Sequence, residues 1–232
     1  MSVLSNKTAA VILAAGVGSR MGCETTKQRI EIAGKSVLKH TLLAFEGAKN
    51  VHEIVVVCRE NEFDFVNNEL HGICKPARVV KGGKCRAESA FLGFGALSSD
   101  VEYLLVHDAA RCLITPEEID KVADAIYNFG AATASVRVSD TLKLCEGGKI
   151  VKTVPRDNLR AMQTPQGFSK KIYAEAIAAS GTLDETVTDD NMLVEGIGVH
   201  PFCVDTSTSN IKITTSHDLE LAEFILSKRK GI

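Results

Sequence analysis

The sequence predicts an α/β protein in which a mostly parallel sheet is covered by helices on both faces. Apolar runs typical of buried strands alternate with segments of helical periodicity as far as residue 138. A glycine-rich loop directly follows the first apolar run, which is where open α/β sheets bind their ligands. After residue 138 a glycine turn between two alternating segments interrupts this rhythm, and α/β character then returns.

The first half of the chain supplies most of the expected sheet. Its helices begin with polar residues and carry apolar residues at i, i+3, i+4 and i+7, as in 116–129. That helix is introduced by Thr115-Pro116-Glu117-Glu118, a capping box with proline at the first helical position. The expected strands are 9–13, 53–58, 78–81, 103–107 and 131–138, and the expected helices are 36–45, 60–70, 85–97 and 116–129.

The second half begins with a β-hairpin, because 141–145 and 149–154 flank Glu146-Gly147-Gly148. A hairpin alone is marginally stable, so we expect it to pack either on its own chain or on a second subunit. A helix at 169–180, strands at 199–204 and 211–214, and a helix at 217–227 follow. We therefore expect a single domain, 1–232, with an inserted β-arm at about 139–157.

The composition is that of a globular enzyme-sized domain. The chain has 232 residues, 45% hydrophobic and 24% charged, which suits one sizeable core. A net charge of −2 argues against a general nucleic-acid or membrane-surface binder, and no apolar stretch approaches the ~20 residues that span a bilayer. The first residues lack a signal-peptide pattern. Seven cysteines without a Cys-x-x-Cys motif indicate reduced thiols in a cytoplasmic protein.

The loop 14–28 carries the strongest functional signal. Its glycines let backbone amides approach an anion, and Arg20 and Lys27 add two positive charges. It is not a dinucleotide fingerprint, because Met21 stands where the third glycine would be. It is not a P-loop, because Gly22 is followed by Cys23. A triphosphate site and an ordinary glycine-rich turn both fit this composition.

Other segments extend the candidate site. The turn 82–89 follows a strand and opens a helix, and Asp108 ends another strand at the edge that binds ligands. Asp108 could take a sugar hydroxyl or an Mg²⁺-bound water, or could simply pair with Arg111. Asp189 fits a helix N-cap. Alternation places Lys212 opposite its apolar neighbours, where it could face solvent or bind phosphate.

These parts favour phosphoryl or nucleotidyl transfer. The sequence contains no nucleophile elbow and no histidine or glutamate metal motif, and it offers amide-rich loops, scattered cations and a strand-end carboxylate. Positioning and charge stabilisation supply most of the catalysis in such reactions. If the acceptor is itself a phosphate, no general base is required, because its second pKa of about 6 leaves it largely dianionic at pH 7.

The whole set resembles the 2-C-methyl-D-erythritol 4-phosphate cytidylyltransferases of the non-mevalonate isoprenoid pathway. The resemblance implies a Rossmann-like mixed sheet of the nucleotide-diphospho-sugar transferase type with a protruding arm. It covers nearly the whole chain and lies in seven segments: 13–28, 82–89, 107–111, Asp140-Thr141, 163–166, 188–190 and 210–215.

The resemblance also implies residue roles. CTP would bind Ala14, Ala15, Gly16, Gly18, Gly82, Gly83, Ser89 and Asp108, with cytosine at the turn 82–89. Arg20 and Lys27 would stabilise the transition state at the α-phosphorus. The acceptor would be held by Asp108, Arg156, Thr164, Thr188 and Lys212, of which Arg156 and Lys212 also count as catalytic. Mg²⁺ would lie near Asp108, and the arm would form a homodimer that brings Arg156 to the neighbouring site.

Three positions depart from the family pattern. Thr26 and Cys112 stand where the family usually has proline, which alters loop stiffness more than chemistry. Arg160 stands where tryptophan is frequent and adds a charge beside the acceptor region. Ribitol 5-phosphate therefore remains an alternative acceptor, and a non-catalytic nucleotide-binding module remains an alternative of another class. A sugar 1-phosphate nucleotidyltransferase fits the segment 210–215 less well.

Overall fold

The computed structural model describes residues 6–16 and 26–229, and its centre is a seven-stranded mixed sheet. The strand order is β11-β7-β10-β6-β1-β4-β5. These strands are β1 (Thr8–Leu13), β4 (Glu53–Cys58), β5 (Ala77–Lys81), β6 (Tyr103–Asp108), β7 (Ala131–Arg137), β10 (Arg160–Ser169) and β11 (Phe202–Asp205). β10 runs antiparallel to both its neighbours, β6 and β7, whereas the other pairs are parallel. The predicted α/β class is therefore confirmed.

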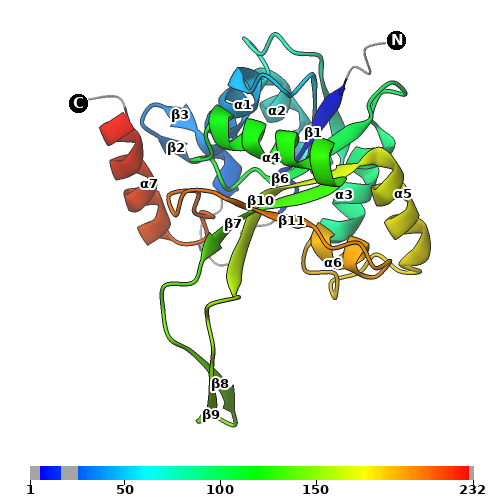
Figure 1. Ribbon diagram of the computed structural model, residues 1–232. Coiled ribbons are helices and arrows are strands. Elements are labelled where there is room, and N and C mark those ends of the chain that lie inside the picture. The colour runs from blue at the N-terminus through cyan, green and yellow to red at the C-terminus, as the bar shows by residue number, and fades with distance from the viewer. Residues whose placement is uncertain (1–5, 17–25, 230–232) are drawn as a thin grey trace.

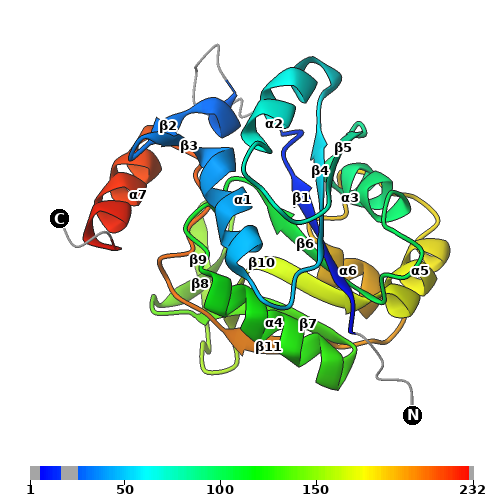
Figure 2. The ribbon, with the colours of Figure 1, turned by 90° about the horizontal axis from the view of Figure 1, so that it is seen from above.

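Helices cover both faces of this sheet (Figures 1 and 2). They are α1 (Val37–Gly47), α2 (Phe63–Glu69), α3 (Arg86–Gly95), α4 (Pro116–Phe129), α5 (Lys170–Ala179), α6 (Asp190–Glu195) and α7 (Ser216–Arg229), with short 3-10 turns η2 (Lys27–Arg29) and η3 (Glu60–Glu62). None of the helices in the described ranges is long and apolar enough to cross a bilayer.

Two apolar cores form because β1 alternates between the faces. Ala10 and Ile12 pack with α1, α2 and α4, whereas Val11 and Leu13 pack with α3, α5 and α6. Gly93 of α3 is required for this second contact, since a Cβ there would lie 2.4 Å from Cγ1 of Val11. A third cluster joins α7 to Cys112, Leu113 and Ile213.

The caps that frame α4 agree with the sequence. The Thr115 hydroxyl accepts from the Glu118 amide, and the Glu118 carboxylate accepts from the Thr115 amide. Gly130 ends the helix in the left-handed region at φ 77°. α4 and β4 have the predicted bounds, and the other elements of the first half shift by a few residues.

Three parts of the second half differ from the prediction. β10 was not expected, because its polar and proline-containing sequence does not resemble an interior strand. The strand expected at 199–204 is β11, which begins only at Phe202. The strand expected at 211–214 does not form. Instead Ile213 makes one ladder-like bond, from its amide to the Ala110 carbonyl, and buries its side chain under α7.

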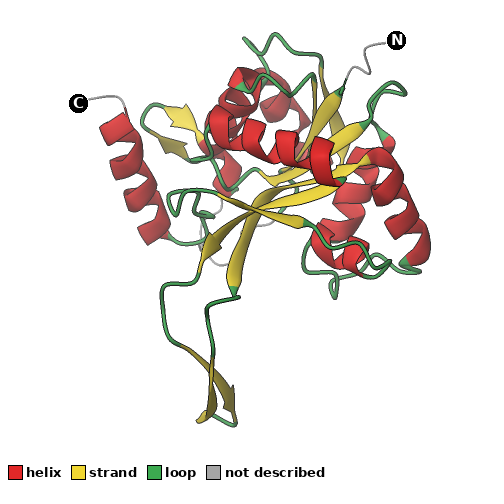
Figure 3. Cartoon of the chain, in the orientation of Figure 1, coloured by secondary structure: helices red, strands yellow, loops and turns green. Residues whose placement is uncertain are grey.

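The hairpin stands off the body of the protein (Figures 1 and 3). β8 (Leu142–Glu146) pairs antiparallel with β9 (Lys149–Val154). Gly147 and Gly148 form its turn with φ of 53° and 77°, which side chains other than glycine rarely adopt. A second small hairpin, β2 (Glu31–Ile32) with β3 (Lys35–Ser36), leads into α1.

Candidate active site

A cavity of about 240 Å³ opens at the carboxyl ends of β1 and β6. This is the edge at which open α/β sheets bind ligands. Its described lining residues are Leu13, Ala15, Gly16, Lys27, Gln28, Gly83, Lys84, Cys85, Arg86, Ser89, Asp108, Ala110 and Lys212. Four of these side chains are cationic and one is a carboxylate, so the lining has the charge to bind a polyanion.

The first predicted loop supplies one wall of this cavity. The Ala14 amide donates to the Val57 carbonyl at 2.7 Å, which extends the β1–β4 ladder by one residue. The Arg59 side chain donates to the Ala15 carbonyl at 3.1 Å. Ala15 and Gly16 then line the cavity. Gly18 and Arg20 lie outside the described residues, as does Cys23.

The second predicted turn lies against the first. A Cβ on Gly82 would lie 2.7 Å from the Cβ of Ala15, so only glycine permits this approach. The Gly83 amide donates to the Ser89 hydroxyl at 3.1 Å. Glu88 caps the turn through the Lys84 amide at 2.6 Å, and its side chain fills the place of a Cβ on Gly83. The two glycine-containing segments therefore form one continuous wall.

Asp108 is the carboxylate of the cavity lining, and two cations hold it. Its Oδ1 lies 3.3 Å from Nε of Arg86, and its Oδ2 lies 2.7 Å from Nζ of Lys212. Burial raises the pKa of the Asp108 carboxyl, but Arg86 and Lys212 outweigh it and lower that pKa well below its usual range. The carboxylate is therefore ionised near neutral pH. The ion pair with Arg111 that the sequence left open for Asp108 does not form, and Arg86 and Lys212 are its partners instead.

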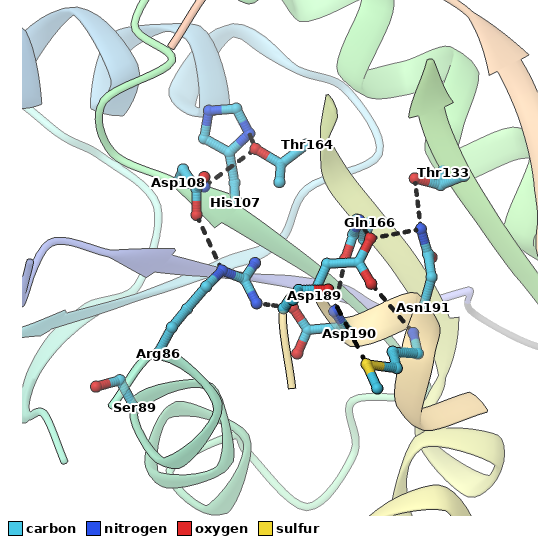
Figure 4. A network of polar contacts seen from close by, with 12 residues as sticks. Arg86, Ser89, His107, Asp108, Thr133, Thr164, Gln166, Asp189, Asp190 and Asn191 are labelled. Atoms are coloured by element: carbon cyan, nitrogen blue, oxygen red, sulfur yellow. Dashed lines mark hydrogen bonds and ion pairs between the residues drawn. The ribbon is translucent and has the colours of Figure 1, made fainter. Parts of the chain in front are cut away.

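Arg86 connects this carboxylate to a second, buried one (Figure 4). Its Nη1 lies 2.7 Å from Oδ2 of Asp190, whose Oδ1 accepts from the Tyr173 hydroxyl at 2.6 Å. The Asp190 amide donates to Oε1 of Gln166 at 2.8 Å. Burial lowers the pKa of Arg86, but Asp190 and Asp108 raise it above its ordinary value. A fixed guanidinium thus joins the start of α3 to the start of α6.

The start of α6 is fixed by the predicted N-cap, Asp189. Its carboxylate accepts from the Met192 amide at 3.1 Å and from the Gln166 side chain at 2.8 Å. Asn191 extends the network to the Thr133 hydroxyl on β7 at 3.2 Å (Figure 4). The N-terminal turn of α6 is therefore tied to the strands β7 and β10.

His107 and Thr164 stabilise the strand end behind Asp108. The Thr164 hydroxyl lies 3.0 Å from Nδ1 of His107 and accepts from the Asp108 amide at 3.1 Å. Burial lowers the pKa of His107 to about 3, so the ring is neutral at pH 7. His107 is therefore a buried structural residue. Thr164, expected at the acceptor, is buried and bonded in this way.

Two predicted acceptor residues lie away from the cavity lining. Arg156 lies at the base of the arm and donates to the Ser139 carbonyl. This hydrogen bond ties the outgoing and returning segments of the arm together. Thr188 is exposed just before α6, with its hydroxyl 4.0 Å from Sδ of Met192. Within one chain, the structure therefore brings Lys27, Asp108 and Lys212 together without these two.

The three departures from the family pattern have local structural explanations. Thr26 has φ −66° and ψ 141°, values that proline also adopts. Cys112 is buried in the third core cluster, and burial raises the pKa of its thiol to about 12. Arg160 forms an ion pair with Asp205 of β11, so its charge is balanced at the edge of the sheet.

Several cavity residues were not singled out by the sequence analysis. Lys84, Cys85 and Arg86 lie within the turn 82–89, and Gln28 ends the loop 14–28. Their segments were recognised, but one-dimensional spacing does not indicate which side chains of a turn face inward. No group of three or more His, Cys, Asp or Glu side chains within 6–16 and 26–229 is arranged to hold a metal ion. The six described cysteines are free.

Comparison with known proteins identifies relatives over nearly the full length. The model of the 2-C-methyl-D-erythritol 4-phosphate cytidylyltransferase family matches residues 8–228. A protein of that name from Pelotomaculum thermopropionicum is 41% identical over 230 residues, covering 97% of each chain. Another from Alkaliphilus oremlandii is 37% identical over 229 residues, again covering 97% of each. The crystal structure of 4-diphosphocytidyl-2C-methyl-D-erythritol synthase from Anaerococcus prevotii superimposes with a TM-score of 0.86 at 30% identity, over 96% of this chain and 99% of that one.

Proposed function

The chain belongs to the 2-C-methyl-D-erythritol 4-phosphate cytidylyltransferase family, and we propose how its cavity performs that reaction. The enzyme transfers a cytidylyl group from CTP to 2-C-methyl-D-erythritol 4-phosphate in isoprenoid biosynthesis, giving 4-diphosphocytidyl-2-C-methyl-D-erythritol and pyrophosphate. The observation that carries the proposal is the meeting of Lys27, Arg86, Asp108 and Lys212 around one cavity, next to the continuous wall that the two glycine-containing segments form.

The nucleotide lies along this glycine-containing wall. The triphosphate binds at Ala14, Ala15 and Gly16, with Gly18 as a further contact residue. The Ala14 amide already donates to the Val57 carbonyl, so the donors are the backbone amides that follow it. Cytosine lies at the turn formed by Gly82, Gly83 and Ser89. Arg86 and Lys84 contribute positive charge on this side of the cavity.

The chemical step is an in-line displacement at the α-phosphorus of CTP. An oxygen of the acceptor phosphate forms the new P–O bond as the bond to the β-phosphate oxygen breaks, and pyrophosphate leaves with that electron pair. The acceptor is already dianionic near pH 7, with a second pKa of about 6, so no side chain has to remove a proton. Lys27 and Arg20 stabilise the charge that accumulates on the equatorial oxygens.

Asp108 suits a divalent cation that arrives with the triphosphate. Mg²⁺ is commonly held by one or two carboxylates together with substrate phosphates and water. Asp108 is ionised and already shares its oxygens with Arg86 and Lys212, so it fits an outer contact through an Mg²⁺-bound water better than a resident metal site. When bound, the ion supplies charge neutralisation on the phosphates. In the proposed complex, Asp108 also contacts a ribose hydroxyl.

The acceptor phosphate is held by Lys212 and, from the chain segments outside the cavity, by Arg156 and Thr188, with Thr164 supporting the strand end beneath. Lys212 reaches the cavity with its ammonium 2.7 Å from Asp108. It can therefore bridge Asp108 and the incoming phosphate. Arg156 does not line the cavity of its own chain, and we infer that it enters the site of a second copy.

The arm offers an apolar surface on which that second copy could bind. Leu142, Leu144, Ile150 and Val151 are exposed on it, with Ile150 67% and Val151 53% accessible. Burial of such side chains against another arm would stabilise a homodimer. The arm would then carry Arg156 into the partner's site. We place the enzyme in the cytoplasm, where its free thiols stay reduced.

Pyrophosphate release tests the assignment. CTP and Mg²⁺ are supplied with 2-C-methyl-D-erythritol 4-phosphate, with ribitol 5-phosphate, or with no acceptor. We expect release with the first substrate only. Pyrophosphate release with ribitol 5-phosphate alone would overturn the assignment of 2-C-methyl-D-erythritol 4-phosphate as the acceptor. No release with either acceptor would favour a nucleotide-binding module that does not catalyse transfer.

A further inference from the structure

Gln28 lies on the cavity wall with a buried polar atom that has no partner. The residue lines the same cavity as Asp108 and Lys212 and is 4% exposed. Its Oε1 is buried and accepts no hydrogen bond from the protein. Among residues 6–16 and 26–229, the only other orphaned buried side-chain atom on a lining residue is Nη2 of Arg86. Buried polar groups without a partner are uncommon and require an explanation.

The turn that carries Gln28 is held firmly in place. The Arg29 amide donates to the Thr26 carbonyl, and the Val37 amide donates to the Ile30 carbonyl, each at 2.9 Å. The Arg29 guanidinium pairs with Glu62 at 2.8 Å and lies 4.4 Å from the centre of the Phe65 ring. These contacts anchor the outer side of the turn, while Gln28 lines the cavity on the other side. The backbone that carries Gln28 is thus fixed before any substrate arrives.

The chemistry of the orphan atom limits what it can bind. A carbonyl oxygen only accepts hydrogen bonds, so it does not suit an ionised phosphate, whose oxygens are acceptors too. It suits a hydroxyl, which can donate. Both substrates of the proposed reaction carry hydroxyls, CTP on its ribose and the acceptor on its polyol chain. The amino group of cytosine is also a donor, but in the proposed function it lies at the turn 82–89, and the phosphates are bound by cations. This leaves the Gln28 acceptor for the sugar-like part of a substrate.

We propose that Oε1 of Gln28 accepts a hydrogen bond from a substrate hydroxyl, and that Gln28 is thereby a binding residue of this site. The proposal rests on the proposed function. Gln28 positions the hydroxyl-bearing carbon chain next to Asp108, while Lys27, its neighbour in sequence, contacts the phosphates. The hydrogen bond to Oε1 forms only when the substrate binds, so this bond stabilises the complex and not the free enzyme.

The test is Gln28→Met, which keeps the length of the side chain and removes its polar atoms. We expect kcat/KM to fall about tenfold, the usual effect of one lost hydrogen bond. The melting temperature of the free enzyme should not fall, because Oε1 has no partner to lose. Thr26→Val is the matched control, since the Thr26 hydroxyl is also buried and orphaned but does not line the cavity. That variant should keep wild-type kcat/KM.

Substrates lacking one hydroxyl identify the partner. Wild type and Gln28→Met are compared with 2′-deoxy-CTP, with 3′-deoxy-CTP, and with acceptors lacking single hydroxyls. Removal of the hydroxyl that Gln28 binds should lower the kcat/KM of wild type about tenfold and should leave the kcat/KM of Gln28→Met unchanged. Unchanged kcat/KM in Gln28→Met, or a loss that adds fully to every deletion, would overturn the proposal. Wild-type turnover of the complete substrates in the same assay tests the proposed function separately.

Discussion

The ammonium of Lys212 lies 2.7 Å from Oδ2 of Asp108, although the two residues come from distant parts of the chain. Lys212 belongs to an extended segment that packs Ile213 under α7, whereas Asp108 ends β6. The pair fixes a cation beside the carboxylate that lines the cavity. It also holds the Lys212 side chain at the cavity, where we propose that it binds the acceptor phosphate.

This pairing predicts that the two residues act as a unit. Lys212→Met should lower kcat/KM for the acceptor about 100-fold, because a phosphate contact is lost. Asp108→Asn should also impair the reaction, since Lys212 loses its anchor. In a double-mutant cycle the combined loss should be smaller than the product of the single losses. Strictly multiplicative losses would mean that the pair has no functional coupling.

His107 predicts a specific pH dependence of stability. Its pKa in the folded protein is lowered to about 3 by burial, against about 6.5 when unfolded. As pH falls, His107 is therefore protonated in the unfolded state before it is protonated in the folded state. The free energy of unfolding that this group contributes above pH 6.5 is lost as pH falls towards 3. This one group should contribute a slope of about 1.4 kcal/mol per pH unit between these limits.

Chemical denaturation at pH 4 to 7 measures that slope. His107→Asn keeps a polar group near Thr164 and removes the titration, so its unfolding free energy should depend less on pH than that of wild type. Equal slopes in the two proteins would show that His107 is not the group responsible.

Sharing of sites across a dimer predicts complementation. In the proposed dimer, Lys27→Ala would damage the site of its own chain, whereas Arg156→Ala would damage the site of the partner chain. Mixed and reassembled, the two inactive variants should recover about a quarter of wild-type activity, because half of randomly formed dimers contain one intact site. No recovery would place Arg156 in the site of its own chain. Ile150→Asp, which puts a charge on the arm, should reduce both the dimer mass and the activity.

The sequence predicted correctly those elements that are specified by their own local residues. The β-branched run of β4 and the capping box of α4 specify their own structure, so both bounds were correct. β10 escaped prediction because it forms through pairing with β6 and β7 on both sides, which no local pattern reveals. Its ladder to β7 shifts register between Met162 and Gln166, around a proline that cannot donate.

The same distinction holds for the site. Alternation correctly placed Lys212 opposite Ile213, although no strand forms there, because one side chain faces the core and the other the cavity. The ion pairs of Arg86 with Asp108 and Asp190 depend on three segments meeting in space. The inward direction of Gln28 depends on how Arg29 is anchored. Neither follows from spacing along the chain.

The most direct test of the central claim, that this cavity stabilises cytidylyl transfer, is the kcat of Lys27→Ala with CTP and 2-C-methyl-D-erythritol 4-phosphate. Lys81→Ala is the control, since Lys81 is exposed, pairs with Glu60 and does not line the cavity. Loss of a charge contact in the transition state should lower kcat at least ~100-fold in Lys27→Ala, and leave the control unchanged. An unchanged kcat in Lys27→Ala would show that Lys27 does not stabilise the transition state in this cavity.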